Sequence, residues 1–236
     1  MSLSKRLESA FRKALYDYQM LDQIHEVGVA LSGGKDSLTL LHLLKEISGR
    51  GFPALTIKAF HVAGEFSCGA GIGQSFLKQI CSDLNVPLIQ LESTQKRESL
   101  ECYSCSRERR RLLFNAAKSE GITTIAFGHH RDDHAQTILM NLLHKGEFAG
   151  NLPKIHMQEY GVTIIRPMIY IRENAIRTFA QQKGFARVVC QCPVGQNSMR
   201  RQTEELLIEL EKIYPNAREN IAHAGLLYGS QKAANP

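Results

Sequence analysis

The chain has 236 residues, of which 43% are hydrophobic, enough to bury the core of one α/β domain with helical appendages. Its net charge of +6 and its pI near 9.0 indicate a polyanionic partner without identifying one. No signal peptide and no apolar run of about 18 residues are found, so we expect a cytoplasmic protein that does not contact a membrane.

The order of apolar and helical patterns along the chain predicts an α/β fold. Apolar, β-branched runs occur at residues 25–31, 54–62, 86–92, 122–128, 161–167 and 186–190. Helical patterns lie between several of them, which predicts a mainly parallel sheet with helices on both faces. Residues 146–161 have no clear period and are expected to form a long loop. The expected segments are an N-terminal amphipathic helix (1–24), the α/β domain (25–195) and a C-terminal helical segment (196–236).

The most informative motif is the polar string SGGKDS, which spans residues 32–37 between the first apolar run and a helical leucine pattern. Gly33 and Gly34 permit a sharp bend and a close approach of backbone amides to a ligand, and the positive end of the next helix faces the loop. A phosphate group suits this arrangement. The loop is not the common nucleotide loop, because Val29 and Asp36 occupy positions where that loop has Gly and Ser or Thr. An ordinary strand-to-helix turn is the alternative.

SGGKDS resembles the loop of the PP-loop ATP pyrophosphatases, whose fold is that of the adenine-nucleotide α-hydrolases. The resemblance implies that ATP is cleaved between its α- and β-phosphates and that AMP passes to a substrate oxygen. It also implies that the whole loop binds the β- and γ-phosphates. The residues concerned are Ser32, Gly33, Gly34, Lys35, Asp36 and Ser37.

A second strand-turn-helix pattern carries the string GHHRDD at the carboxyl end of a strand, the edge where open α/β sheets bind ligands. Carboxylates beside a triphosphate need a cation between them, and Mg²⁺ suits one or two carboxylates with phosphate oxygens. We therefore predict that Asp36 and Asp133 bind Mg²⁺, with Asp132 as an alternative to Asp133. The other interpretation is that both aspartates only favour the start of the next helix.

GHHRDD also resembles the second motif of PP-loop enzymes that modify tRNA. The resemblance implies that five residues lie near the ATP site: Gly128, His129, Asp132, Asp133 and Thr137. His130 and His134 are four residues apart and are a weak candidate zinc pair, because no third ligand accompanies them.

Four cysteines flank the second motif along the chain. Cys102 and Cys105 open a helical pattern, whereas Cys190 and Cys192 close a strand pattern. Without an export signal, metal binding or catalysis is more expected than disulfides. The C-x-x-C spacing suits Zn²⁺, an iron-sulfur cluster or a redox dithiol, and a four-cysteine zinc site is open as well. The other two cysteines are a predicted core residue, Cys81, and a predicted loop thiol, Cys68.

The string C-x-x-C-S-R-x-R-R, the GHHRDD motif and a cysteine pair before QNSMRRQ together resemble the tRNA 2-thiocytidine synthetases, a branch of the PP-loop enzymes. In that family three cysteines bind a 4Fe-4S cluster with one open iron, and Cys102 and Cys105 match two of them. This chain has C-x-C where the family usually has C-x-x-C. Counting back from Arg201-Gln202 places Cys190 on the first cysteine of the family's pair, so Cys190 is assigned as the third ligand and Cys192 is the alternative. The predicted catalytic residues are Asp36, Cys102, Cys105 and Cys190.

Arginines gather beside both cysteine pairs, where they suit RNA phosphates. They are Arg107, Arg109, Arg110, Arg111, Arg200 and Arg201. Arg131 and Arg166 are weaker candidates, and a solvated helix face is the alternative for each arginine.

The resemblance implies an ATP-dependent tRNA sulfurtransferase that adenylates C2 of an anticodon-loop cytidine and replaces its oxygen with sulfur. The expected cofactors are ATP, Mg²⁺ and a 4Fe-4S cluster. The expected partners are tRNA and a sulfur donor such as a cysteine desulfurase, and a homodimer is left open. The alternatives are lysidine synthesis, thiouridine synthesis and a non-catalytic module that binds zinc, ATP and RNA.

Overall fold

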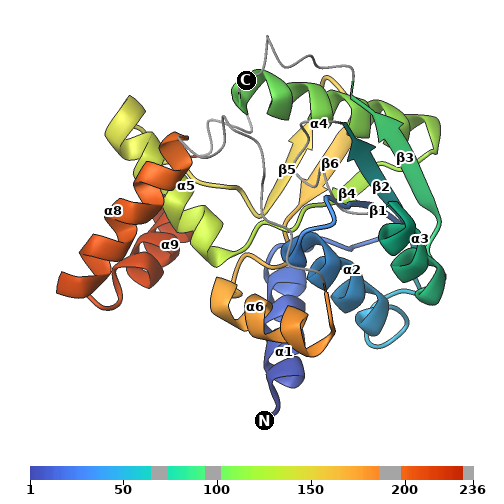
Figure 1. Cartoon of the computed structure of the whole chain (residues 1–236), viewed down its shortest axis with the longest axis horizontal. Coiled ribbons are helices and arrows are strands. Elements are labelled where there is room, and N and C mark those ends of the chain that lie inside the picture. The colour runs from blue at the N-terminus through green and yellow to red at the C-terminus, as the bar shows by residue number, and fades with distance from the viewer. Residues whose placement is uncertain (65–73, 94–101, 186–197, 231–236) are drawn as a thin grey trace.

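The computed structural model describes residues 1–64, 74–93, 102–185 and 198–230 (Figure 1). The helices are α1 (Leu3–Asp17), α2 (Lys35–Ile47), α3 (Gln74–Asp83), α4 (Cys102–Ser119), α5 (Arg131–Lys145), α6 (Glu173–Gln182), α8 (Met199–Ile213) and α9 (Ala217–Tyr228). The strands are β1 (Glu26–Ala30), β2 (Thr56–Ala63), β3 (Leu88–Glu92), β4 (Thr124–Ala126), β5 (Lys154–Met157) and β6 (Val162–Ile165).

The strands form one sheet in the order β3-β2-β1-β4-β6-β5. Its neighbours are parallel except β5 and β6, which are antiparallel. The predicted α/β fold with a mainly parallel sheet is therefore confirmed. The carboxyl ends of β1, β4 and β6 lie together at one edge of the sheet, because these strands are adjacent and parallel. The predicted strand at residues 186–190 lies outside the described residues.

Two elements differ from the sequence-based expectation. The long loop predicted over residues 146–161 is wrong at its end, because Lys154–Met157 forms β5 and pairs with β6. This strand is too short to show a period, and a tight turn closed by Gly161 at φ 63 joins it to β6. Helix α6 lies between the apolar runs at 161–167 and 186–190, where no particular helical pattern was predicted. It buries Ile176, Phe179 and Ala180 on one face.

Helices cover both faces of the sheet, as the alternation of buried side chains along the strands requires. In β2, Ile57 and Ala59 face the core that also holds α1, α2, α3 and α6, whereas Phe60 and Val62 face the core beneath α4. Figure 1 shows α4 on one side of the sheet and α1, α2 and α6 on the other. The two cores fix the sheet, and with it the edge at which the polar loops lie.

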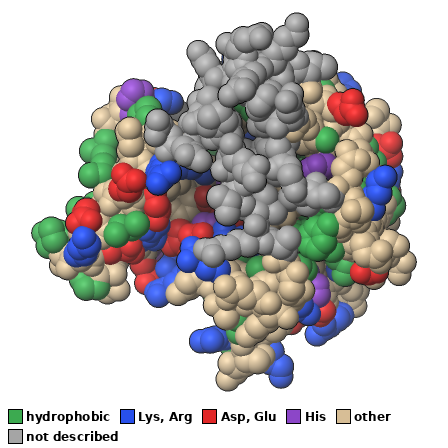
Figure 2. All heavy atoms as spheres, in the orientation of Figure 1, with side chains coloured by type: hydrophobic (Ala, Val, Ile, Leu, Met, Phe, Trp, Pro, Cys, Tyr) green, Lys and Arg blue, Asp and Glu red, His purple; other side chains and the backbone are tan. Residues whose placement is uncertain are grey.

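Helices α5, α8 and α9 form a group beside the sheet, on the left of Figure 1. Hydrophobic, acidic and basic side chains lie together on the surface of this group (Figure 2). Helices α8 and α9 confirm the predicted helical C-terminal segment of the fold. Within the described ranges, every helix is too short or too polar to cross a membrane.

The predicted core position of Cys81 is confirmed, because this residue of α3 is only 1% exposed. Burial raises the pKa of its thiol to about 11. At pH 8, about 0.1% of this thiol is then thiolate, the reactive form. We expect iodoacetamide to leave Cys81 unmodified in the native protein and to alkylate it in urea, with peptide mass spectrometry as the measurement. Rapid alkylation of Cys81 in the native protein would contradict this burial.

Candidate functional site

The SGGKDS loop (Ser32–Ser37) joins the carboxyl end of β1 to the first turn of α2. Gly33 has φ +83, a left-handed conformation that favours glycine. The Ser37 hydroxyl oxygen accepts a hydrogen bond from the Gly33 amide (3.1 Å) and donates one to the Gly34 carbonyl (3.0 Å). No side chain caps α2 at Gly34. The loop is thus held in shape by its own serine, while the start of α2 is available to an anion.

The GHHRDD motif packs directly on this loop. Gly128 follows β4, and a Cβ atom built on it would lie 3.1 Å from the Asp36 carbonyl carbon and 3.1 Å from the Ser37 nitrogen. Such a contact is tighter than van der Waals packing allows without a shift. Glycine therefore suits this position, because it lets the backbone of the second motif lie directly against the backbone of the SGGKDS loop.

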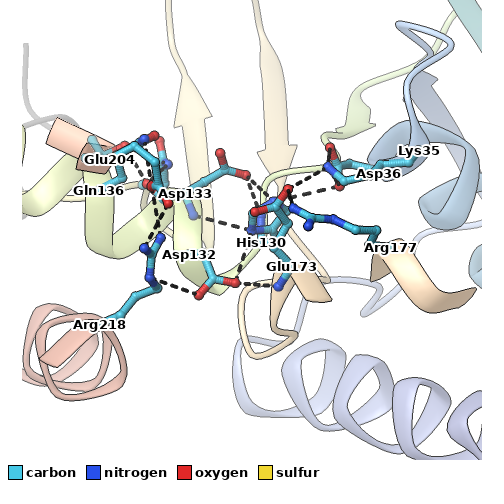
Figure 3. Close-up of polar contacts among 12 residues, drawn as sticks. Lys35, Asp36, His130, Asp132, Asp133, Gln136, Glu173, Arg177, Glu204 and Arg218 are labelled. Atoms are coloured by element: carbon cyan, nitrogen blue, oxygen red, sulfur yellow. Dashed lines mark hydrogen bonds and ion pairs between the residues drawn. The ribbon is translucent and has the colours of Figure 1, made fainter. Parts of the chain in front are cut away.

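His130 connects the two motifs electrostatically (Figure 3). It is the N-cap of α5 and forms a reciprocal capping box with Asp133. Its Nδ1 accepts a hydrogen bond from the Asp133 amide, so Nε2 is assigned the proton. Nε2 lies 3.3 Å from Asp133 Oδ2 and 3.7 Å from Asp36 Oδ1. One imidazole therefore faces the carboxylates of both motifs.

The two aspartates of the motif point to different neighbours. Burial alone would raise the pKa of Asp133, but His130 and Arg200 outweigh it and hold that pKa below its usual range. Asp132 instead accepts a hydrogen bond from the Glu173 amide. Of the two aspartates, Asp133 therefore shares the neighbour His130 Nε2 with Asp36, and these two carboxylates are the ones that could hold Mg²⁺ together.

The described residues contain no cluster of three or more His, Cys, Asp or Glu side chains that could hold a metal by themselves. A divalent ion at Asp36 and Asp133 would therefore need oxygens from a ligand. The weak zinc pair gains no support, because His134 packs against Gly150 and Gly225 on the side of α9, whereas His130 Nε2 faces the SGGKDS loop.

Lys35 lies between two carboxylates. Its Nζ is 3.0 Å from Asp36 and 3.1 Å from Glu173, which also contacts Arg177 at 3.2 Å. Burial alone would lower the pKa of Lys35, but the two carboxylates outweigh this effect and raise it. Lys35 is thus a firmly charged ammonium group beside the loop. Glu173 had not been predicted as a site residue, because it is a lone acid in the first turn of α6 and belongs to no motif.

His129 is a neutral imidazole at the end of β4. It stacks on Phe127 and accepts a hydrogen bond from Arg166 Nε (3.3 Å). Burial, followed by the positive charge of Arg166, lowers the pKa of His129 to about 3. Burial also lowers the pKa of Arg166 to about 10. Arg166 is only 7% exposed and donates to the Leu152 carbonyl. It therefore orders the strand ends and is not positioned as a surface contact for RNA.

A sequence model of the PP-loop domain matches residues 3–190. The tRNA-cytidine(32) 2-sulfurtransferase of Stenotrophomonas maltophilia (strain K279a) is 34% identical over 234 residues, which cover 94% of this chain and 74% of that protein. The protein of the same name from Xanthomonas euvesicatoria pv. vesicatoria (strain 85-10) is 32% identical, with 95% and 75% covered. The chain belongs to the PP-loop tRNA-cytidine 2-sulfurtransferase family. The predicted family is confirmed.

Solved structures share the PP-loop fold. The U34-tRNA thiolase NcsA from Methanococcus maripaludis, solved with its 4Fe-4S cluster, matches with a TM-score of 0.77 at 23% identity. The match covers 94% of this chain and 78% of that chain. The NH3-dependent NAD synthetase of Campylobacter jejuni matches with a TM-score of 0.51 at 15% identity, covering 100% of this chain and 98% of that chain. At these identities the likeness is one of fold alone.

The cysteines of this PP-loop protein are only partly described. Helix α4 begins at Cys102, and Cys105, three residues later on the same helix, is partly buried. The Ser93 hydroxyl, directly after β3, donates to Glu108 of α4 at 3.2 Å, which ties this end of the helix to the carboxyl edge of the sheet. Cys68, Cys190 and Cys192 lie outside the described residues.

The arginines expected to bind RNA lie on two helices of the PP-loop protein. On α4, Arg107, Arg110 and Arg111 are exposed and Arg109 is partly buried. The charge of Arg110 reaches His129 and Arg166 at the strand ends, and contributes to lowering the pKa of both.

At the start of α8, Arg200 forms an ion pair with Asp133 (3.3 Å), and Arg201 lies 3.5 Å from Glu205. Arg131 pairs with Glu219 of α9 (2.9 Å). Arg110 and Arg200 thus lie near the second motif, whereas Arg131 contacts Glu219 and so links α5 to α9.

Proposed function

We propose that this chain thiolates tRNA by converting a cytidine of the anticodon loop into 2-thiocytidine, at position 32 as in the names of its relatives. Membership of the family makes the chain an ATP-dependent tRNA-thiolating PP-loop enzyme. The observation that carries the finer proposal is the shared edge of the sheet. The SGGKDS loop, the Asp133 carboxylate and the cysteine-bearing end of α4 all lie at the carboxyl ends of the strands.

The first half of the proposed reaction activates the base. The C2 oxygen of cytidine is a poor leaving group. It attacks the α-phosphorus of ATP, the bond from that phosphorus to the bridging oxygen breaks, and pyrophosphate leaves. The amides at the start of α2 and the charged Lys35 hold the phosphates, and Asp36 and Asp133 would hold Mg²⁺. A bound Mg²⁺ would neutralise charge on the phosphates as pyrophosphate departs.

The second half exchanges oxygen for sulfur. A sulfur nucleophile adds to C2, the ring nitrogen takes up the electron pair, and the pair returns as AMP departs with the former C2 oxygen. Cys102, Cys105 and Cys190, with Cys192 as the alternative, would hold a 4Fe-4S cluster. When bound, that cluster would supply an open iron for the sulfur that a donor such as a cysteine desulfurase delivers. The proposal is supported by the spacing of Cys102 and Cys105, which stand three residues apart in the first turn of α4.

The tRNA is proposed to lie over α4 and the start of α8. The exposed Arg107, Arg110 and Arg111 suit backbone phosphates, and the target base has to leave its stack to reach the activating loop. We also propose that two chains form a homodimer through α8 and α9, because these helices expose apolar side chains such as Ile213 and Tyr228. Light scattering would measure the oligomeric state.

Nucleoside analysis tests the substrate. We expect tRNA from cells that lack the gene to contain no 2-thiocytidine by mass spectrometry, and the wild-type gene to restore it. Unchanged 2-thiocytidine with loss of lysidine or of a thiouridine would instead favour one of the other PP-loop reactions.

Metal analysis tests the cluster separately. Protein purified without oxygen should show the broad visible absorption of an iron-sulfur cluster. Stoichiometric zinc without iron in the same sample would contradict the cluster and favour the non-catalytic module.

A further inference from the structure

Helix α9 contacts the starts of both helices that carry nucleotide-site residues. Glu219 forms ion pairs with Arg131, the first residue of α5, and with Arg172, the N-cap of α6. Its neighbour Arg218 points toward Asp132, the second residue of α5, with Nε 3.9 Å from Oδ1 (Figure 3). Two adjacent residues of α9 thus hold the N-termini of α5 and α6 together. The matched PP-loop domain ends at residue 190, so α9 lies outside it.

Asp132 connects Arg218 of α9 to the start of α6. Its second carboxylate oxygen, Oδ2, accepts the hydrogen bond of the Glu173 amide, the first amide of α6. A carboxylate at a helix N-terminus is favourable because it meets the positive end of the helix dipole. The side chains of Asp132 and Arg218 are only 10% and 11% exposed. A carboxylate buried to this extent needs a positive partner.

Glu173 completes the connection to the SGGKDS loop. Its carboxylate lies 3.1 Å from Lys35 Nζ, so the position of the first turn of α6 decides where that carboxylate stands. A continuous series of contacts therefore runs from Arg218 through Asp132 and the Glu173 amide to Lys35. Every residue in it is described, and each contact is an ion pair or a hydrogen bond.

We propose that Arg218 is a positioning residue of the nucleotide site. It holds Asp132 against the start of α6, and α6 in turn keeps Glu173 beside Lys35, so that the ammonium group is correctly placed before ATP arrives. Asp132 then serves as a strut between helices, and Asp133 is the carboxylate that faces the nucleotide. This proposal rests on the ATP-binding part of the proposed function and is independent of sulfur transfer.

Arg218 also joins α8 to α9, which supplies a matched control. It forms ion pairs with Glu204 (2.8 Å) and with Glu211 (3.1 Å), both on α8. Glu211→Gln weakens the contact between these helices and leaves the contact with Asp132 in place. Arg218→Gln removes both. Asp132→Asn completes the set, because it weakens the contact with Arg218 and leaves both ion pairs between Arg218 and α8 in place.

Equilibrium dialysis with ATP alone tests the proposal, because it needs neither tRNA nor a sulfur donor. We expect Arg218→Gln to weaken ATP binding about tenfold, and Glu211→Gln to leave the Kd within about twofold. Asp132→Asn should weaken binding to a similar extent, and the double variant should be no worse than either single one, because both act through one series of contacts. Hydrogen exchange at the Glu173 amide should accelerate in Arg218→Gln.

Other outcomes would overturn the proposal. They are an unchanged Kd in a folded Arg218→Gln protein, additive effects of the Asp132 and Arg218 changes, or an equal loss in Glu211→Gln. If Arg218→Gln does not fold, Arg218→Lys is measured instead, because lysine keeps the charge but not the paired geometry of arginine. It should weaken ATP binding less than tenfold but measurably, and an unchanged Kd in that variant would also overturn the proposal. A failure of tRNA thiolation in the wild-type chain would leave these ATP measurements intact.

Discussion

Cys105→Ser is expected to lower the rate of tRNA thiolation by at least about 100-fold, while the affinity for ATP stays within about twofold. A serine hydroxyl is a hard, weakly acidic ligand and does not replace a thiolate on iron. Cys105 lies on α4, whereas the amides proposed to bind phosphate belong to α2 on the other face of the sheet. The change should therefore separate sulfur transfer from activation.

The measurement is 2-thiocytidine formed in an anaerobic reaction, together with the visible absorption of the protein. Cys81→Ala is the matched control, because it also removes a cysteine but from the core of α3, where the thiol acts as a small apolar group. It should lower stability and retain thiolation. A fully active Cys105→Ser enzyme would remove Cys105 from the proposed cluster.

Asp36→Asn is expected to slow tRNA-dependent pyrophosphate release by about 100-fold or more. The change keeps the shape of the side chain and removes its charge, so Mg²⁺ loses a ligand and Lys35 loses one of its two carboxylates. The Mg²⁺ concentration needed for half-maximal rate should rise as well. The non-catalytic alternative predicts no loss of function.

Glu46→Gln is the control for this change, since it removes a carboxylate of the same helix that is 45% exposed and pairs with Arg50. It should release pyrophosphate at the wild-type rate. Equal rates for Asp36→Asn and Glu46→Gln would contradict a role for Asp36 in activation.

The parts of the site that the sequence predicts are local. SGGKDS and GHHRDD each combine a strand end, a tight turn and a helix start within a few residues, so the chain itself brings their polar groups to the sheet edge. The sheet and most helices follow from apolar periodicity in the same way. The short strand β5 was missed because four residues between glycine-containing turns carry too little pattern to detect.

The rest of the site depends on contacts between segments far apart in sequence. Glu173 and Arg218 lie in separate helices and meet the motif only after α6 and α9 have packed, so no spacing in the sequence marks them. The adjacent acids Asp132 and Asp133 could not be told apart for a related reason. Successive residues of a helix point about 100° apart, and only the packed neighbours show which one faces the loop.

Gly128 brings the second motif into close contact with the SGGKDS loop. A single methyl group there would already press on the backbone at Asp36 and Ser37, so the loop and the segment after β4 are packed backbone against backbone. The Ser37 hydroxyl fixes the loop from within. We therefore expect the loop to pay most of its loss of conformational entropy during folding. Phosphate binding would then cost little additional entropy for ordering the loop.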